Sequence, residues 1–370
     1  MKSNSKNIIL FCPTKNWGGI EKNVLLRAKF LGNSGYKVVV VTLRNTFEDK
    51  FLNLKNVSVQ TITKRGGDLN FSVVGNYMRL IRKVRPITVF AALKRDWWLV
   101  SLAAHLTKVS NTILYLGNIR KIRNSLKYRL VFNTFKTKVL VNSDSLKENL
   151  FQNSSYFNTN NLVKINNGIE LPQTKKNEDW SPITTLDLPE NVFLVGVAGW
   201  LNYRKGFDLL PEILEKLPEN VHIIHAGTGG LELDMDQILS SYPLLTNRIH
   251  FLGHVNDMNQ FFQHIDVFLL CSREEGMANV LLESLSHGKP IVSTKVPGSE
   301  ELLENGTYGI LTEINDVAAM ANAVKSLLEQ KIKFDPDFLK QRITHSFSLQ
   351  KMMSNTEALF FPGAKQYTKS

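Results

Sequence analysis

The chain has 370 residues, of which 43% are hydrophobic, with a formal net charge of +12 and two cysteines. This length favours two domains over one, and no apolar run approaches the ~20 residues that a membrane span requires. Cys12 and Cys271 each lie in a strand-like run, which fits buried thiols in a reducing cytosol and excludes a disulfide framework or a cysteine metal cluster. The apolar run at 8–12 is too short for a signal peptide, so we expect a cytoplasmic protein.

The N-terminal residues have the pattern of a βαβ unit. A buried strand is expected at 7–13, an amphipathic helix after it, and a second strand at 38–42. The turn between the first strand and the helix reads Asn-Trp-Gly-Gly-Ile-Glu and carries the pair Gly18 and Gly19. It lacks the Gly-x-Gly-x-x-Gly spacing of dinucleotide-binding proteins, which argues against hydride transfer. The glycines serve either a tight turn or the close approach of a ligand.

Two polar residues follow later strands of this half. Asp96 comes after a strand expected at 87–91 and opens a helix at 99–106. An Asp in this place is most often a helix cap, although it could also be a polar group in a binding cleft. Asn118 follows a strand at 112–116, where it could hydrogen-bond a hydroxyl but cannot carry a proton.

The C-terminal half repeats the alternation of strands and helices. Residues 171–191 are polar, contain three prolines and show no periodicity, so we interpret them as a linker. A strand at 192–199 leads to a basic turn with Arg204 and Lys205. Strands at 221–226 and 249–253 end at Gly227 and just before His254.

Residues 271–283 hold the most informative motif. A buried strand at 267–270 precedes them and a helical pattern follows, so a strand-to-helix turn is expected at the carboxyl edge of a parallel sheet, where open α/β sheets bind ligands. The start of such a helix attracts phosphates, and Gly276 would let the backbone approach one. Asn279 and Glu283 are four apart and share one helix face, whereas Glu275 precedes the helix. The plain alternative is an acidic loop with a solvated helix face.

Glu275 and Glu283, with seven residues between them, resemble the Glu-x7-Glu signature of retaining GT-B glycosyltransferases of family 4. The Gly18–Gly19 turn and Lys205 with Gly206 are similar to two further motifs of that family, although Trp200 stands where the family usually has arginine. The resemblance implies an α/β fold of GT-B architecture, with two Rossmann-like domains facing across a cleft. The acceptor-side domain would comprise 1–170, with a tail at about 350–370 packed back on it. The nucleotide-sugar domain would comprise 192–349.

The resemblance also implies an activity and its residues. The activity is retaining, metal-independent transfer of a sugar from a nucleotide-sugar to a glycan or lipid-linked acceptor, with no cofactor. Glu275, Arg204 and Lys205 would be catalytic, the basic pair neutralising the departing diphosphate and Glu275 holding the sugar, while Glu283 would anchor the ribose. As a loop lysine, Lys205 is expected to contribute little to stability. The implied donor-site residues are Gly18, Gly19, Lys205, Gly227, His254, Glu275, Gly276, Met277, Ala278, Asn279, Val280 and Glu283. Asp96 and Asn118 would face the acceptor.

Several features argue for or against other functions. Gly117 and Asn118 replace a histidine that many family members carry, so no acid–base group is identified. Asp234-Met235-Asp236 spells a metal motif but lies in a helical pattern, and His222 and His225 fall on opposite faces of a strand, so no metal is expected. The alternatives are a sugar-nucleotide epimerase of the same architecture and a non-catalytic sugar-binding protein.

Charge is distributed unevenly along the chain. Residues 1–170 contain 28 of the 45 basic and 8 of the 33 acidic side chains, a formal charge of +20, so residues 171–370 carry −8. The segment 119–138 interleaves basic with apolar residues, and Phe132 or Phe135 could enter lipid headgroups. We therefore expect peripheral docking on the inner, anionic face of a membrane, and no nucleic-acid partner because no such motif accompanies the charge. A lipid-linked acceptor would suit the synthesis of cell-surface polysaccharide or lipopolysaccharide.

Overall fold

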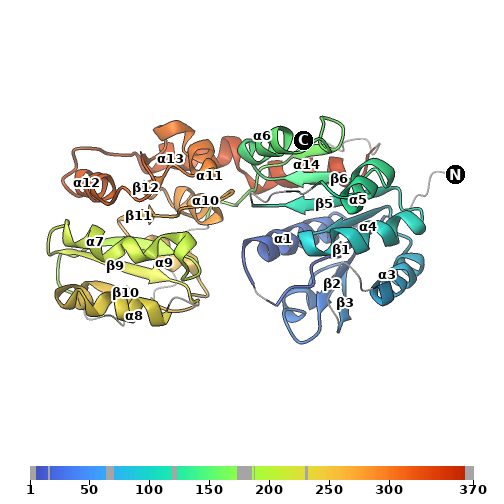
Figure 1. Cartoon of the computed structure of the whole chain (residues 1–370). Coiled ribbons are helices and arrows are strands. Elements are labelled where there is room, and N and C mark those ends of the chain that lie inside the picture. The colour runs from blue at the N-terminus through green and yellow to red at the C-terminus, as the bar shows by residue number, and fades with distance from the viewer. Residues whose placement is uncertain are drawn as a thin grey trace. The chain divides into compact units, whose positions relative to one another are not determined.

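In the computed structural model, the chain divides into two compact units, residues 1–167 with 350–370 and residues 168–349 (Figure 1). The structure describes residues 6–15, 17–63, 71–118, 122, 124–172, 186, 188–229 and 232–362. Most of the expected linker, 173–185 and 187, therefore lies outside the described residues. Each unit is built on a wholly parallel sheet with helices, which confirms the prediction of two Rossmann-like α/β domains.

The sheet of the first unit has the order β3-β2-β1-β4-β5-β6-β7. Its inner strand β1 is buried on both faces, since Ile9 and Phe11 join one core while Ile8 and Leu10, also fully buried, point the other way. This explains why it reads as a continuous apolar run. The strands are β1 (Asn7–Phe11), β2 (Lys37–Leu43), β3 (Val57–Ile62), β4 (Thr88–Ala91), β5 (Asn111–Leu116), β6 (Lys138–Val141) and β7 (Leu162–Lys164).

The helices of the first unit come from both ends of the chain. They are α1 (Gly19–Asn33), α2 (Asp49–Leu52), α3 (Phe71–Val84), α4 (Trp97–Leu106), α5 (Leu126–Arg129) and α6 (Asp144–Asn153), together with α14 (Leu349–Phe360). Figure 1 shows α14 in red among the blue and green elements. The Tyr36 hydroxyl donates to Glu357 over 2.6 Å, and its ring stacks on Phe361 with centroids 4.0 Å apart. The C-terminal segment is thus part of the first unit's core.

The sheet of the second unit has the order β10-β9-β8-β11-β12-β13. Alternate residues of its strands feed two separate hydrophobic cores, Val195 and Val267 on one face and Leu194 and Phe268 on the other. The strands are β8 (Phe193–Ala198), β9 (Val221–Ala226), β10 (Ile249–Phe251), β11 (Val267–Leu270), β12 (Ile291–Thr294) and β13 (Ile310–Thr312). The helices are α7 (Leu210–Glu215), α8 (Glu232–Ser240), α9 (Met258–His264), α10 (Asn279–Ser286), α11 (Pro297–Leu302), α12 (Val317–Leu328) and α13 (Pro336–Ser346).

No described helix combines the length and the apolar character needed to cross a bilayer.

Candidate functional site

Lys205 and Glu275 lie on the loops after β8 and β11, which are neighbouring strands at the centre of the second sheet. The strand order reverses between these two strands, and ligands of open α/β sheets bind at that position, outside the carboxyl ends. The Lys205 ammonium forms an ion pair with Glu275 Oε1, and the two side chains are 14% and 8% exposed. Lys205 is thus mostly buried and paired, which argues against the expectation that it contributes little to stability.

The conformation of the turn that carries Lys205 is fixed by local hydrogen bonds and by the packing of Gly206. Residues Tyr203–Lys205 form a 3₁₀ helix in which the Asn202 side chain accepts from the N–H of Lys205 over 3.1 Å. Gly206 ends it at φ 71°, a left-handed conformation that favours glycine. A Cβ on Gly206 would lie 2.0 Å from the Cys271 carbonyl oxygen. The close packing of the turn against the end of β11 therefore fixes the Lys205 backbone beside the Glu275 loop.

The start of α10 is suited to an anion. Its N-cap, Ala278, provides no side-chain oxygen to the first turn, and backbone N–H groups at such a position attract phosphates. Met277 and Ala278 are only 6% and 4% exposed because their side chains belong to the core, so only their backbone could reach a ligand. A Cβ on Gly298 would lie 1.5 Å from the Gly276 carbonyl oxygen, so α11 presses directly on this turn.

Arg273 was not singled out from the sequence, although it lies inside the motif. Its guanidinium binds both carboxylate oxygens of Asp208 over 2.7 Å, and it is centred 3.9 Å from the Tyr203 ring. Hydrogen bonds to Asp208 raise the pKa of Arg273, and the negative charge of Asp208 raises it further. Its neighbour Arg204 is exposed on the same turn. Of the two arginines, Arg204 has the more exposed side chain, whereas the Arg273 side chain is 15% exposed and paired with Asp208.

Glycines lie just beyond the ends of β8, β9 and β10, three consecutive strands of the second sheet. The N–H of Gly227 donates to Gly253 over 2.7 Å, and His225 Nε2 donates to the Gly199 carbonyl over 3.0 Å. Burial lowers the pKa of His225 to about 4, although the bond to Gly199 works in the opposite direction. His225 is therefore neutral at pH 7 and holds the turn that leads to Lys205. His254 is exposed just beyond Gly253.

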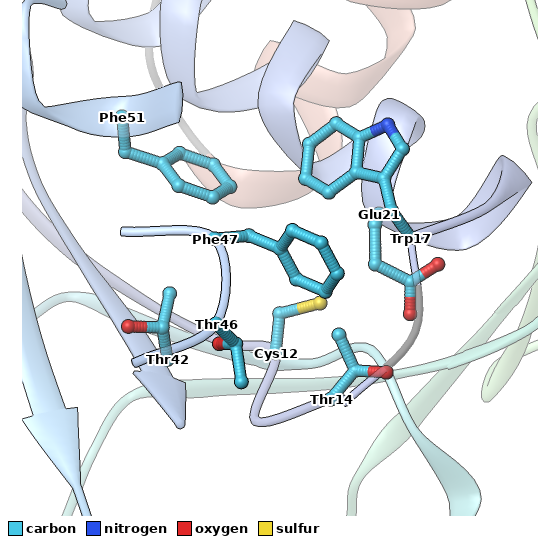
Figure 2. Close-up of a pocket in the computed structure, with 8 residues that line it drawn as sticks. All are labelled: Cys12, Thr14, Trp17, Glu21, Thr42, Thr46, Phe47 and Phe51. Atoms are coloured by element: carbon cyan, nitrogen blue, oxygen red, sulfur yellow. The ribbon is translucent and has the colours of Figure 1, made fainter. Parts of the chain in front are cut away.

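In the first unit, the predicted Gly18–Gly19 turn opens α1 at the carboxyl end of β1. The Glu21 carboxylate hydrogen-bonds back to the Gly18 backbone, while burial raises its pKa. Figure 2 shows a small pocket beside this turn, in which the rings of Trp17 and Phe47 lie 5.2 Å apart between centroids. Its lining comprises Cys12, Thr14, Trp17, Glu21, Thr42, Thr46, Phe47 and Phe51. Glu21 thus has a structural role in holding the glycine turn.

Asp96 occupies the N-cap position of α4 but makes no side-chain cap hydrogen bond there. It is 0% exposed, and Arg95 Nε lies 3.7 Å from its carboxylate. Arg95 also donates from its guanidinium to the Pro13 carbonyl, so the loops after β1 and β4 are joined at the point where the strand order reverses in this sheet. Asn118, half-buried, follows β5. The acceptor role of Asp96 and Asn118 stays a prediction.

The basic segment differs from the expectation in its aromatic residues. Residues 119–121 and 123 lie outside the described part of the chain. Phe132 is 3% exposed within the core, and Phe135 stacks on His105 with centroids 4.5 Å apart. Phe132 is packed inside the unit, so the idea that its ring enters lipid headgroups is wrong, whereas Phe135 is only half-buried and its contact with a membrane stays a prediction. Leu126 in α5 is 71% exposed.

The described histidines and acidic residues are not arranged to bind a metal ion. Within the described residues, no three His, Cys, Asp or Glu side chains are grouped so as to hold an ion. His222 and His250, on adjacent strands, instead contact each other through ring nitrogens 3.1 Å apart. Asp236 is exposed on α8, as the helical pattern predicted.

Comparison with known proteins finds similarity to glycosyltransferases. Residues 192–330 match the family model described as "Glycosyl transferases group 1". The chain is 32% identical over 143 residues to the lipopolysaccharide core biosynthesis glycosyltransferase LpsE of Rhizobium meliloti (strain 1021), covering 39% of this chain and 42% of that protein. It is 22% identical over 356 residues to the capsular polysaccharide biosynthesis glycosyltransferase CapM of Staphylococcus aureus, covering 84% and 91%.

The fold has close structural matches. Anabaena Alr3699/HepE, solved in complex with UDP-glucose, superposes with a TM-score of 0.81 at 20% identity, over 95% of this chain and 99% of that one. At this identity the match shows the fold, and it confirms the expected GT-B architecture.

Proposed function

We propose that this chain, which belongs to the group 1 glycosyl transferases, moves a sugar from a nucleotide-sugar to a glycan or lipid-linked acceptor in the assembly of a bacterial surface polysaccharide. The observation that carries the proposal is the buried Lys205–Glu275 pair between β8 and β11, beside the start of α10. A positive charge and a helix start at one sheet edge suit a diphosphate. Relatives named for lipopolysaccharide and capsule synthesis support the biological setting.

The main chemical requirement is to stabilise charge on the departing diphosphate. An ammonium has three donors, so Lys205 can bind Glu275 and a phosphate oxygen together. The backbone N–H groups at Met277 and Ala278 would supply further donors, and the exposed Arg204 could swing onto the phosphates. Glu275 would accept from sugar hydroxyls and offset positive charge at the anomeric carbon. Glu283, one turn into α10, would accept from the ribose.

The reaction is proposed to retain anomeric configuration and to need no metal ion. Lys205, Arg204 and the helix start replace the cation that would otherwise neutralise the diphosphate. The donor in Alr3699/HepE, UDP-glucose, makes a uridine diphosphate sugar the first candidate. Incubation with a panel of labelled nucleotide-sugars and a polyprenyl-linked acceptor tests this directly. Transfer with the donor's anomeric configuration supports the proposal, isomerisation of the donor indicates an epimerase, and binding without turnover indicates a sugar-binding protein.

Docking on an anionic membrane is a separate proposal, supported by the +20 charge of residues 1–170. Basic residues contribute about 1 kcal/mol each at an anionic leaflet. Lys127 and Arg129 follow the exposed Leu126 within α5. Vesicles with phosphatidylglycerol should float with the protein at low salt and lose it at high salt, and Lys127→Glu with Arg129→Glu should weaken flotation. No flotation with these vesicles at low salt would favour a soluble acceptor.

A further inference from the structure

Arg273 joins the loop that carries Lys205 to the loop that carries Glu275. Its Nη1 and Nη2 donate to the two oxygens of Asp208 over 2.7 Å, and Nη1 also donates to the Tyr203 carbonyl over 2.6 Å. Its Nε donates to Asn315 Oδ1 over 2.8 Å. The N–H of Arg273 donates to the Arg204 carbonyl over 2.8 Å. These contacts occupy most of the donors of one guanidinium.

Two partners of Arg273, Tyr203 and Asp208, lie on either side of Lys205 in the sequence. Tyr203 precedes Lys205 by two residues and Asp208 follows it by three, whereas Arg273 itself precedes Glu275 by two. One planar group therefore fixes both ends of the Lys205 turn relative to the Glu275 loop. Arginine suits this task because its rigid fork binds a carboxylate at two points and stacks on an aromatic ring. A guanidinium so engaged has little capacity left for a substrate.

We propose that Arg273 is a positioning residue that acts on donor binding and transfer through Lys205 without touching the substrate. The inference rests on the proposed function, because Lys205 is taken to bind the departing diphosphate. Removing the guanidinium would free the turn at Tyr203 and Asp208 and leave a partly buried carboxylate unpaired. The ammonium would then spend less time beside Glu275 and the start of α10. Small displacements of this kind can lower a rate by about 10².

The first test requires no ligand. Hydrogen exchange in the segments 203–208 and 271–277 is compared between the wild type and Arg273→Gln. Exchange should rise in both segments, and Arg273→Lys should restore protection only in part, since an ammonium lacks the fork. Asp208→Asn should raise hydrogen exchange in the same two segments, and combining it with Arg273→Gln should raise exchange little further.

The second test separates positioning from general damage. The dissociation constant of UDP is measured by calorimetry for Arg273→Gln alone, Lys205→Ala alone and both together. Arg273→Gln should weaken UDP about tenfold in the wild-type background and less than about twofold when Lys205 is already absent, because the effect passes through that side chain. If Arg273→Gln merely unfolded part of the protein, calorimetry would show fewer UDP-binding sites per chain, and this loss would be the same with and without Lys205.

Arg342→Gln is the matched control. Arg342, in the same unit, donates to the Leu302 and Glu301 carbonyls over 2.9 Å, pairs with Glu304 and lies 5.2 Å from the Tyr308 ring centroid. It should leave UDP affinity and the exchange of both loops unchanged. Equal effects of Arg273→Gln with and without Lys205, or exchange no higher than in the control, would overturn the inference. If the wild type itself neither binds UDP nor turns over a nucleotide-sugar, the proposed function fails, and hydrogen exchange alone decides whether Arg273 positions the Lys205 turn.

Discussion

Replacing Lys205 by alanine should damage activity and stability for the same structural reason. Turnover should fall by about 10² or more, the scale of losing one preorganised group that stabilises developing charge. The Glu275 side chain, 8% exposed, would lose its ammonium partner. Breaking a buried pair costs about 3–5 kcal/mol, and residual solvent contact at both side chains places the loss near 3 kcal/mol.

Two further variants separate the causes. Lys205→Met with Glu275→Gln removes both charges, so it should recover much of the stability in urea unfolding while staying inactive. Lys295→Ala breaks an ion pair with Glu313 whose side chains are 42% and 68% exposed, and should therefore cost little stability. Wild-type turnover in Lys205→Ala, or a stability loss no larger than in Lys295→Ala, would refute the reasoning.

Three other outcomes are expected. Glu283→Gln should weaken nucleoside diphosphate binding in calorimetry more than Glu275→Gln does, whereas Glu275→Gln should mainly lower turnover; equal binding by both would end this division of roles. Activity should survive EDTA, and a loss restored by Mg²⁺ or Mn²⁺ would overturn metal independence. His225, with a pKa of about 4 in the fold and ~6.5 unfolded, takes up a proton more readily when unfolded, so stability should fall between pH 6.5 and 4 by up to about 3 kcal/mol. Urea unfolding at both pH values should show a smaller fall in His225→Gln, and an equal fall would contradict the assignment.

The fold could be predicted from the sequence because its strands and turns produce short, local sequence patterns. Apolar runs that are buried on both faces of a parallel sheet, such as β1 and β8, stand out against the glycine turns between them. The short strand β7 was missed because its few apolar residues stand between runs of asparagine. The spacing of Glu275 and Glu283 likewise located the start of α10, since a strand-to-helix turn is a short-range feature.

Long-range contacts were less accessible. Asp208 and Arg273 are far apart in the sequence, and neither residue type predicts that they meet. Phe132 was assigned to a membrane surface because basic neighbours suggest exposure, but a side chain turned inward from a basic segment has the same sequence pattern. Sequence motifs identify the loops that carry the functional residues, whereas the side chains that hold those loops in place become known only from contacts in the folded protein.

The position of α14 has a consequence for the order in which the protein is made. The Thr88 hydroxyl and the Asn111 amide of the first sheet both bind backbone carbonyls at the end of α14. The second unit, in contrast, is one continuous stretch of chain. A ribosome adding ~5–20 residues per second needs roughly 10–40 s to make that stretch, during which the first sheet lacks its last helix. The unit begun first is therefore completed last, and a chain released early, before α14, would leave its N-terminal half permanently unfinished.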